Sequence, residues 1–466
     1  MKDADAPMRA VDIAPLRTAV ALRESDEGRD AASTDFGRMV RKLPRAVVTP
    51  QSPEDVRRTL DFARHTRCPV AVRGAGHSQA GQSLTDGGIL LDLTGLDRIG
   101  EIRDGAVRVQ AGATWRKLVR HVQARGYLPP VLTTSLDVTV GGTLSTGGLG
   151  ASSHRYGAQT DNVDELVAVT GDARQLRCSR TENPALFDCV RCGLGQFAVI
   201  TEARIRLRRA LPDVRTFFLV YDDIEALMQD QQQVVSDDRF EYIASTCLPR
   251  AMGLERLLAR GSPFAERRYV MSLTTEFDGE CDADRALAGL HGGRLLGAED
   301  GSARDVPFGP DRLGRGDRAD RRLAHPWIEG ILPWRNAGRC VAEVLADLPS
   351  ALPTDTAVLL WAARRDRFGA PMLALPASEL LMGFAILPAV KPAALPRLLP
   401  GLEAAGRRLT TMGGKRYLSG WIDYDHEQWR AHFGDLWPRV VECKAAFDPR
   451  GILDPGFIRY RPAQPA

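Results

Sequence analysis

The stretch that decides the fold of this chain reads Arg73-Gly74-Ala75-Gly76-His77-Ser78-Gln79-Ala80-Gly81-Gln82. A β-type run at residues 68–72 precedes it, and a second strand-like run at 88–93 follows it. Glycines around one histidine between two strands predict a tight loop with bare backbone amides, which is how a backbone approaches a phosphate group. From this loop alone, an ordinary hairpin with an exposed histidine is an equally good interpretation.

Later stretches of the chain weaken the hairpin interpretation. A second glycine-rich stretch reads Val140-Gly141-Gly142-Thr143-Leu144-Ser145-Thr146-Gly147-Gly148-Leu149-Gly150. It is followed by Asp161-Asn162-Val163, a strand-like run at 166–170 and Gly193-Leu194-Gly195-Gln196-Phe197-Ala198-Val199-Ile200-Thr201. The order of these stretches, more than any one of them, points to a cofactor site.

This order and spacing resemble the FAD-binding domain (PCMH type) of the vanillyl-alcohol-oxidase superfamily, and more narrowly the cytokinin dehydrogenases. The resemblance extends over nearly the whole chain, to His325-Pro326-Trp327 and to the C-terminal His432-Phe433-Gly434. It implies a flavoprotein oxidoreductase. In that family the histidine of the first loop carries FAD through a covalent bond to the 8α-methyl carbon, and His77 matches that position. Asp137 stands where bicovalent relatives have a cysteine, so a single covalent bond is expected.

The same resemblance assigns a set of cofactor-binding residues. In this chain they are Arg73, Gly74, Ala75, Gly76, His77, Ser78, Gln82, Thr139, Gly141, Gly142, Leu144, Ser145, Gly148, Asp161, Asn162 and Ile200.

The catalytic positions depart from the family pattern. Cytokinin dehydrogenases carry a proton-accepting aspartate five residues before the threonine that matches Thr139, where this chain has Thr134. A family glutamate of the substrate domain aligns with Ala244. Neither side chain takes up a proton near neutral pH. The remaining candidates for the base are Tyr417, Asp137 and solvent. Tyr417 resembles a family tyrosine above the flavin and is favoured, whereas Asp137 is expected to face away from Thr134 on an extended segment.

Composition excludes several classes of partner. The chain has 62 basic and 59 acidic residues and a net charge of +3, which gives no reason to expect nucleic acid or an anionic membrane as a partner. No stretch reaches the ~18 apolar residues of a membrane span. The N-terminus lacks the apolar segment of a signal peptide, so a cytoplasmic protein is expected.

The eight cysteines form no small-domain disulfide pattern. Cys189 and Cys192 make a CxxC pair, which fits a redox pair, half of a zinc site, or two small residues in a loop near the flavin. The second pair that zinc would need is absent, so no metal site is expected and the loop interpretation is favoured.

The pattern of apolar runs predicts an α+β fold with two domains. Residues 1–33 are expected to be a flexible segment, and 34–209 the FAD-binding domain. Residues 210–425 alternate strand-like runs with helices, which predicts a substrate domain with an antiparallel sheet covered by helices. The polar run at 292–322 predicts a surface loop or lid, and 426–466 are expected to return to the FAD-binding domain.

Two helices are marked by their first residues. Ser52 is a plausible N-cap for a helix that begins at Pro53, and a second helix is expected from Thr114 to about Gly126.

The sequence thus predicts an FAD-dependent oxidase or dehydrogenase that takes a hydride from a C–N or C–O bond of a small molecule, in specialised metabolism, and passes the electrons to oxygen or another acceptor. Two alternatives stay open. One is a cytokinin dehydrogenase with a relocated base. The other is a flavoprotein that catalyses a non-redox cyclisation with FAD as a scaffold.

Overall fold

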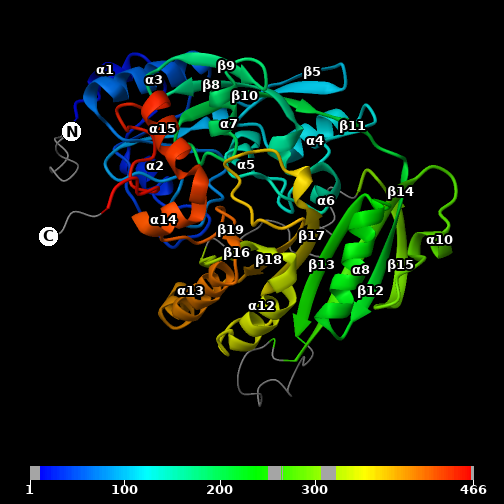
Figure 1. Cartoon of the computed structure of the whole chain (residues 1–466). Coiled ribbons are helices and arrows are strands. Elements are labelled where there is room, and N and C mark those ends of the chain that lie inside the picture. Colours follow the sequence, from blue (N-terminus) through cyan, green and yellow to red (C-terminus); the bar gives the residue numbers. More distant parts are fainter. Residues whose placement is uncertain (1–10, 250–263, 265, 306–321, 463–466) are drawn as a thin grey trace.

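The computed structural model describes residues 11–249, 264, 266–305 and 322–462. It has two parts that lie side by side (Figure 1). The N-terminal part contains the glycine-rich stretches, and the other is built on one large sheet. This is the mixed α+β architecture that the sequence predicted.

Two sheets form the N-terminal part. The first has the order β1-β2-β4-β3, in which β2 and β3 run parallel to β4: β1 (Leu22–Arg23), β2 (Ala46–Val48), β4 (Ile89–Asp92) and β3 (Val70–Arg73). The second is antiparallel with the order β5-β6-β10-β8-β9: β5 (Ile99–Arg103), β6 (Ala106–Gln110), β10 (Ala198–Arg206), β8 (Val163–Thr170) and β9 (Gln175–Ser179). A short pair joins β7 (Tyr127–Leu128) to β11 (Arg208–Arg209).

The two helices predicted from their caps are confirmed. Helix α3 spans Pro53–Thr66, and the Ser52 side chain accepts a hydrogen bond from Asp55 N in a capping box. Helix α4 spans Trp115–Gln123 with Thr114 as its N-cap. The remaining helices of this part are α1 (Ala14–Arg17), α2 (Asp26–Ala31), α5 (Val140–Leu144), α6 (Ser153–Tyr156) and α7 (Pro184–Val190).

The second part is an eight-stranded antiparallel sheet. Its order is β15 (Arg294–Ser302), β12 (Asp213–Tyr221), β14 (Arg267–Phe277), β13 (Tyr242–Pro249), β17 (Ala357–Arg364), β18 (Leu380–Leu387), β16 (Ile328–Pro333) and β19 (Lys415–Arg416). Helices α8 (Ile224–Asp237), α12 (Trp334–Asp347) and α13 (Leu395–Thr411) pack on one face (Figure 1). On the strands other than the edge strands β15 and β19, alternate residues enter the core under these helices, so the residues between them point to the opposite face.

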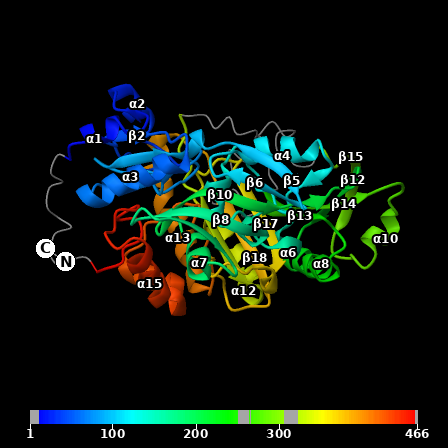
Figure 2. The same ribbon diagram turned by 90° about the horizontal axis from the view of Figure 1, so that it is seen from above.

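The C-terminal segment packs on the N-terminal part. Val70 N donates to Ile452 O and Asp454 N donates to Val70 O, so residues 452–454 run along β3. Helix α15 (Trp437–Phe447) follows α14 (His426–Phe433) and contacts α7. Both views place α15 beside the N-terminal part (Figures 1 and 2).

Two expectations about irregular segments need correction. Within the segment 1–33 that was expected to be flexible, residues 11–33 include the helices α1 and α2 and the strand β1, which pairs with β2, and residues 1–10 lie outside the described residues. The run at 292–322 is not one loop, because 294–302 form the edge strand β15, paired with β12. Residues 306–321 lie outside the described residues. The sequence did not predict β15 because its residues are mostly exposed and show no alternation of apolar and polar side chains.

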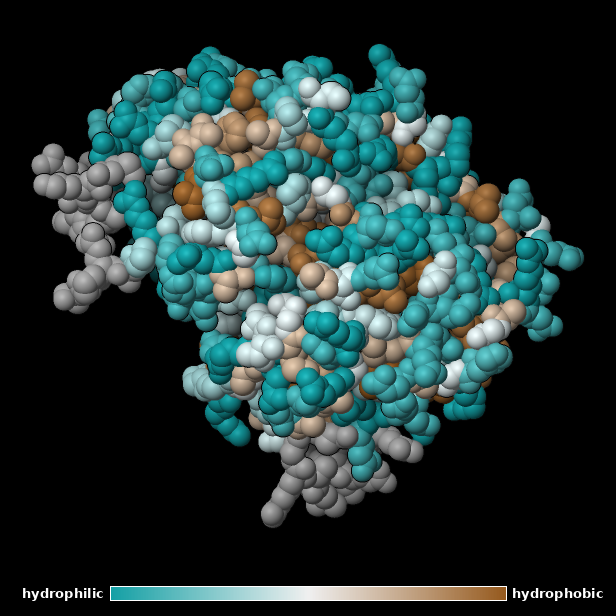
Figure 3. Space-filling model, viewed as in Figure 1, coloured by the Kyte–Doolittle hydropathy of each residue, from teal (hydrophilic) through white to brown (hydrophobic). Residues whose placement is uncertain are grey.

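On the face shown in Figure 3, apolar groups lie among polar residues. In the part of the chain that the structure describes, no helix combines the length and the hydropathy needed to span a membrane.

Candidate active site

The first glycine-rich loop is held in shape by two charged side chains, the partly buried Arg73 and the buried Asp35. Arg73 Nη1 donates to Thr34 O over 2.8 Å, and Asp35 accepts hydrogen bonds from Ser78 Oγ (2.9 Å) and Gly81 N (2.8 Å). Burial raises the pKa of Asp35, and the bonds from Ser78 and Gly81 oppose that rise. Gly76 has φ +71°, and a Cβ atom there would lie 2.4 Å from Arg73 Nη2, so a larger residue would strain the backbone and displace the Arg73 guanidinium.

This loop offers donors to an anion. Within the described residues, the backbone N–H groups of Ala75, Gly76 and Ser78 donate to no protein acceptor. Unpaired N–H groups on one ordered turn form an anion-binding concavity. The loop therefore fits the pyrophosphate of FAD.

The second glycine-rich stretch lies against the first. A Cβ atom on Gly74 would lie 2.0 Å from Thr139 Oγ1, so the two loops pack backbone to side chain. Thr139 caps α5 by accepting a hydrogen bond from Gly142 N (3.3 Å). Gly141 N donates to Ala111 O over 2.7 Å, which ties α5 to the residue that follows β6.

The third glycine-rich stretch, which begins at Gly193, is hydrogen-bonded to the second. Cys192 N donates to Leu144 O (2.9 Å), and Leu194 N donates to Ser145 O (2.8 Å). Ile200 is buried on β10 beside a bulge, where the pairing steps from Ile200↔Ala168 to Glu202↔Val167. The predicted cofactor residues of all three stretches therefore lie in one continuous region.

Three further predicted residues fasten this region to its neighbours. Asp161 accepts hydrogen bonds from Ala158 N and Gly369 N, both over 2.8 Å, and Asn162 Nδ2 donates to two backbone carbonyls. Gln82 Nε2 donates to Leu418 O (3.1 Å) across the boundary between the two parts. These side chains shape the loops through backbone groups.

His77 lies in an aromatic cluster that joins the two parts of the molecule. Its ring stacks on Phe36 with centroids 4.0 Å apart, and it meets the edge of Trp327 at 5.5 Å. His325 stacks on Phe36 at 4.1 Å. The histidine of the FAD loop and the His325-Pro326-Trp327 landmark of the other part are therefore neighbours.

Tyr417 contacts the second glycine-rich stretch directly. Its hydroxyl accepts a hydrogen bond from Gly148 N over 3.0 Å, and a Cβ atom on Gly147 would lie 3.4 Å from its ring. Burial, and next the nearby Glu329 carboxyl, raise the pKa of Tyr417 well above 10. A phenol with so high a pKa remains protonated at neutral pH, so it suits a hydrogen-bonding role and not that of a base.

The other catalytic candidates lie apart from Tyr417. Thr134 and Asp137 are both exposed, on a bend and not on the extended segment that the sequence analysis expected. Asp137 forms an ion pair with Arg116 at 2.6 Å, which keeps its carboxylate at the protein surface. Ala244 is exposed on β13.

Glu329 is a residue that the sequence analysis missed. It lies on β16, two residues after Trp327, and is partly buried. Ser419 Oγ donates to its carboxylate over 2.5 Å. Burial raises the pKa of Glu329 to about 7, against the opposing effects of the Ser419 bond and the Arg416 charge. The signal in the sequence was a single acidic residue in the otherwise apolar run 328–332, directly after a family landmark.

The CxxC pair is not a unit in the structure. Cys189 forms a disulfide with Cys443, which links α7 to α15. Cys192 is a buried free thiol 3.8 Å from Thr160 Oγ1. A link between residues so far apart in the chain has no local signature, and for this reason the spacing of the cysteines did not predict it.

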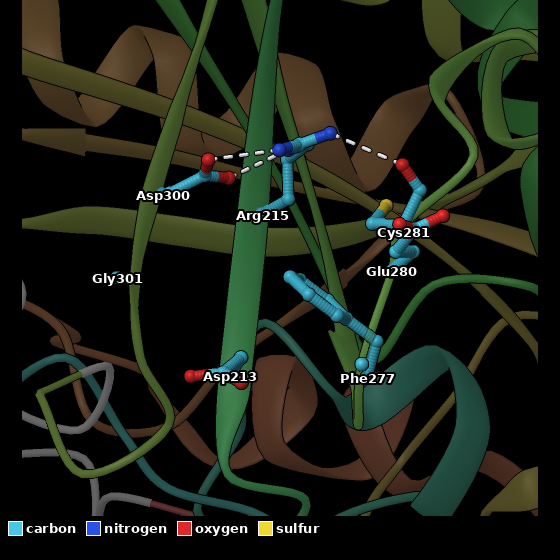
Figure 4. A pocket seen from close by; sticks show the side chains of 8 residues that line it. Asp213, Arg215, Phe277, Glu280, Cys281, Asp300 and Gly301 are labelled. Atoms are coloured by element: carbon cyan, nitrogen blue, oxygen red, sulfur yellow. Dashed lines mark hydrogen bonds and ion pairs between the residues drawn. The ribbon is translucent and has the colours of Figure 1, made fainter.

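Two recesses lie outside the loops. The first, about 410 Å³ in volume, lies between β12 and β15 (Figure 4), where Asp300 and Cys281 O already bind Arg215. No predicted site residue lines it, and we assign it no chemistry. The second, about 300 Å³, lies between the loop at 368–375 and α14 and includes Lys415 and His432.

Two family profiles match this chain. The family described as "FAD binding domain" matches residues 44–179. The family described as "Cytokinin dehydrogenase 1, FAD and cytokinin binding" matches residues 317–458. The first match contains His77 and the second contains Glu329 and Tyr417.

Relatives match along almost the full chain. An uncharacterized oxidoreductase, ORF5 in the fasciation locus of Rhodococcoides fascians, is 33% identical and covers 92% of this chain and 96% of its own. Cytokinin dehydrogenase 6 of Oryza sativa subsp. japonica is 30% identical over 93% of this chain and 90% of its own. The crystal structure of 6-hydroxy-D-nicotine oxidase from Arthrobacter nicotinovorans shares the fold, with a TM-score of 0.71 at 20% identity over 93% of this chain and 96% of that one.

Proposed function

Since the chain belongs to the cytokinin dehydrogenase family of FAD-dependent oxidoreductases, we propose that it oxidises a C–N or C–O bond of a small molecule other than a cytokinin. We propose further that it holds FAD through one covalent bond to His77. The electrons then pass to oxygen or to another acceptor.

The observation that carries the covalent bond is the position of His77. The ring lies on the same loop as the unpaired N–H groups of Ala75, Gly76 and Ser78, and Phe36 and Trp327 fix its orientation. A bound pyrophosphate would thus bring the rest of the cofactor toward an imidazole that is already oriented. When bound, FAD supplies the acceptor for a hydride.

The proposal that the substrate is not a cytokinin depends on two positions at which this chain lacks the acidic residues of the family. Thr134 and Ala244 provide neither the base nor its acidic partner. A cytokinin seated as in the family would meet a threonine hydroxyl, and the loss of a general base typically slows such a reaction by ~10²–10⁴-fold.

A second candidate is cytokinin oxidation with a relocated base. Two observations favour it: relatives named cytokinin dehydrogenases match over nine tenths of the chain, and the Glu329 carboxyl lies beside Tyr417. In this second candidate, the cytokinin must bind in an orientation that directs its N–H toward Glu329 on β16.

One experiment separates these candidates. Purified enzyme is mixed anaerobically with isopentenyladenine, and with a panel of amines and alcohols, and loss of the oxidised-flavin absorbance is followed by stopped flow. Fast bleaching by a panel compound and slow bleaching by isopentenyladenine supports the proposal. Fast bleaching by isopentenyladenine supports the second candidate. Conversion of a substrate without any bleaching supports the non-redox alternative and contradicts both.

A further inference from the structure

Glu329 projects from the sheet face that is turned away from the helices. Its neighbours Ile328 and Leu332 belong to the core under α12 and α13, and a Cβ atom on Gly330 would lie 3.0 Å from Leu409 of α13. Because side chains alternate along a strand, Glu329 points to the opposite face. That face carries Tyr417, since Gly330 pairs with Arg416 on the neighbouring strand β19.

The loop that carries His77 and the second glycine-rich stretch both contact residues next to Glu329. Trp327, two residues before it, meets the ring of His77. Tyr417 N donates to Glu329 O over 3.1 Å, and the Tyr417 hydroxyl reaches Gly148 in the second glycine-rich stretch. The strand neighbours of Glu329 thus contact both the proposed flavin attachment point and the second glycine-rich stretch.

The Glu329 carboxyl has a hydroxyl partner and no cation bound to it. Ser419 Oγ donates to Oε2 over 2.5 Å, whereas the guanidinium of Arg416 binds the backbone oxygen of Glu329 over 2.9 Å. The ion pairs of the described residues include none to Glu329. Tyr417 is the titratable group on the same face of the sheet, whereas the Arg416 side chain extends toward α13 and acts on the Glu329 carboxyl only through its charge. A carboxylate that is bonded to a hydroxyl and not to a cation is free to accept a proton.

We propose that Glu329 is the catalytic base, which accepts the N–H or O–H proton of the substrate as the neighbouring C–H hydride leaves for FAD. This inference rests on the proposed function. The substrate C–H and N–H or O–H bonds break, and a C=N or C=O bond forms. Two electrons leave with the hydride, the proton ends on the Glu329 carboxylate, and oxygen or another acceptor reoxidises the flavin.

Glu329 can act as a base only when its carboxyl group is ionised, so the reaction should depend on pH. Burial raises the pKa of Glu329 to about 7, so the carboxylate predominates only above that pH. The rate of flavin reduction in the wild type is therefore expected to rise with pH and to level off above about 7.

The test compares Glu329→Gln with Glu403→Gln. Glu403 lies on α13 and accepts a hydrogen bond from Trp421 Nε1 (3.3 Å), so it also lies near Arg416 but on the helix side of the sheet. Each variant is assayed by anaerobic stopped flow with the best substrate, across pH. Infrared spectra of the same flavin-loaded proteins, recorded across pH, report carboxyl protonation without any turnover.

The proposal expects Glu329→Gln to reduce flavin ~10²–10⁴-fold more slowly, to lose the pH dependence, and to lose one carboxyl that titrates near pH 7. Glu329→Asp should recover part of the rate, and Glu403→Gln should behave as wild type. An unchanged rate and pH profile in Glu329→Gln would overturn the proposal while leaving the proposed function intact. If no compound bleaches the wild type, the proposed function fails. The infrared titration then decides alone, because absence of a Glu329-dependent band near pH 7 overturns the inference.

Discussion

The imidazole of His77 stacks face to face on the ring of Phe36, with centroids 4.0 Å apart and an interplanar angle of 11°. The Phe36 ring also stacks on His325, which belongs to the His325-Pro326-Trp327 landmark of the second part of the molecule. The residue proposed to carry the flavin is thus oriented by a contact that spans both parts of the molecule.

We expect His77→Ala to abolish the covalent attachment of flavin. Wild-type protein denatured in acid or detergent should keep yellow fluorescence on a gel, and the variant should show none. The proposal of a bond to His77 is wrong if the denatured variant still carries FAD.

Replacement of Gly76 by alanine should destabilise the FAD loop. The residue has φ +71°, and the added Cβ would approach Arg73 Nη2 to 2.4 Å, so a cost of about 1–3 kcal/mol in the free energy of unfolding is expected. Denaturant unfolding measures it. Gly105→Ala is a matched control, because Gly105 has φ +65° but no atom within 4 Å of the added Cβ. Equal losses in the two variants would show that the Arg73 contact adds nothing.

Tyr417→Phe should have a smaller effect on flavin reduction than Glu329→Gln. The phenol holds Gly148 N through one hydrogen bond, a contact worth ~0.5–1.5 kcal/mol, and its raised pKa disfavours a role as base. Asp137→Asn should leave the rate close to wild type, because Asp137 pairs with Arg116 at the surface. The sequence predicted Tyr417 as the favoured base, and a loss of ~10²-fold or more in the stopped-flow reduction rate of Tyr417→Phe would support that prediction.

Ser419→Ala should move the pH dependence of flavin reduction to higher pH. The Ser419 hydroxyl donates to the Glu329 carboxylate and lowers its pKa, so removing it makes the ionised form harder to reach. The midpoint of the pH profile is therefore expected at a higher pH in Ser419→Ala than in the wild type. A midpoint that is unchanged or lower in Ser419→Ala would show that the Ser419 hydroxyl does not stabilise the ionised form of the group that sets the pH profile.

The stability of the protein should also report on Glu329. Its pKa rises from the ordinary 4.5 to about 7 on folding, so the folded state binds the proton more tightly and loses stability as pH rises from about 4.5 to about 7. Glu329→Gln lacks this loss, and its free energy of unfolding relative to wild type should grow across that window by up to ~3 kcal/mol. Unfolding in denaturant at a series of pH values tests this. A constant difference between the two proteins would contradict a shifted pKa.

The sequence by itself determined the FAD-binding loops and the elements around them. The α3 cap at Ser52, the glycine at residue 76 and the order of the three glycine-rich stretches are local features, because a cap, a positive φ and a strand–loop spacing depend on neighbours in the chain. The large antiparallel sheet followed from strand-like runs that alternate with helices along the second half of the chain.

Only the tertiary structure decided which side chains share the site. The disulfide between Cys189 and Cys443 joins residues 254 apart in sequence, and the polar edge strand β15 depends on its pairing with β12. Asp137 was nearer in sequence to the expected position of the base, but an ion pair holds it at the surface. Glu329 and Tyr417 are brought together by the pairing of β16 with β19. The environment that raises the pKa of Glu329 is burial among distant segments, and burial is a property of the folded packing that no local pattern encodes.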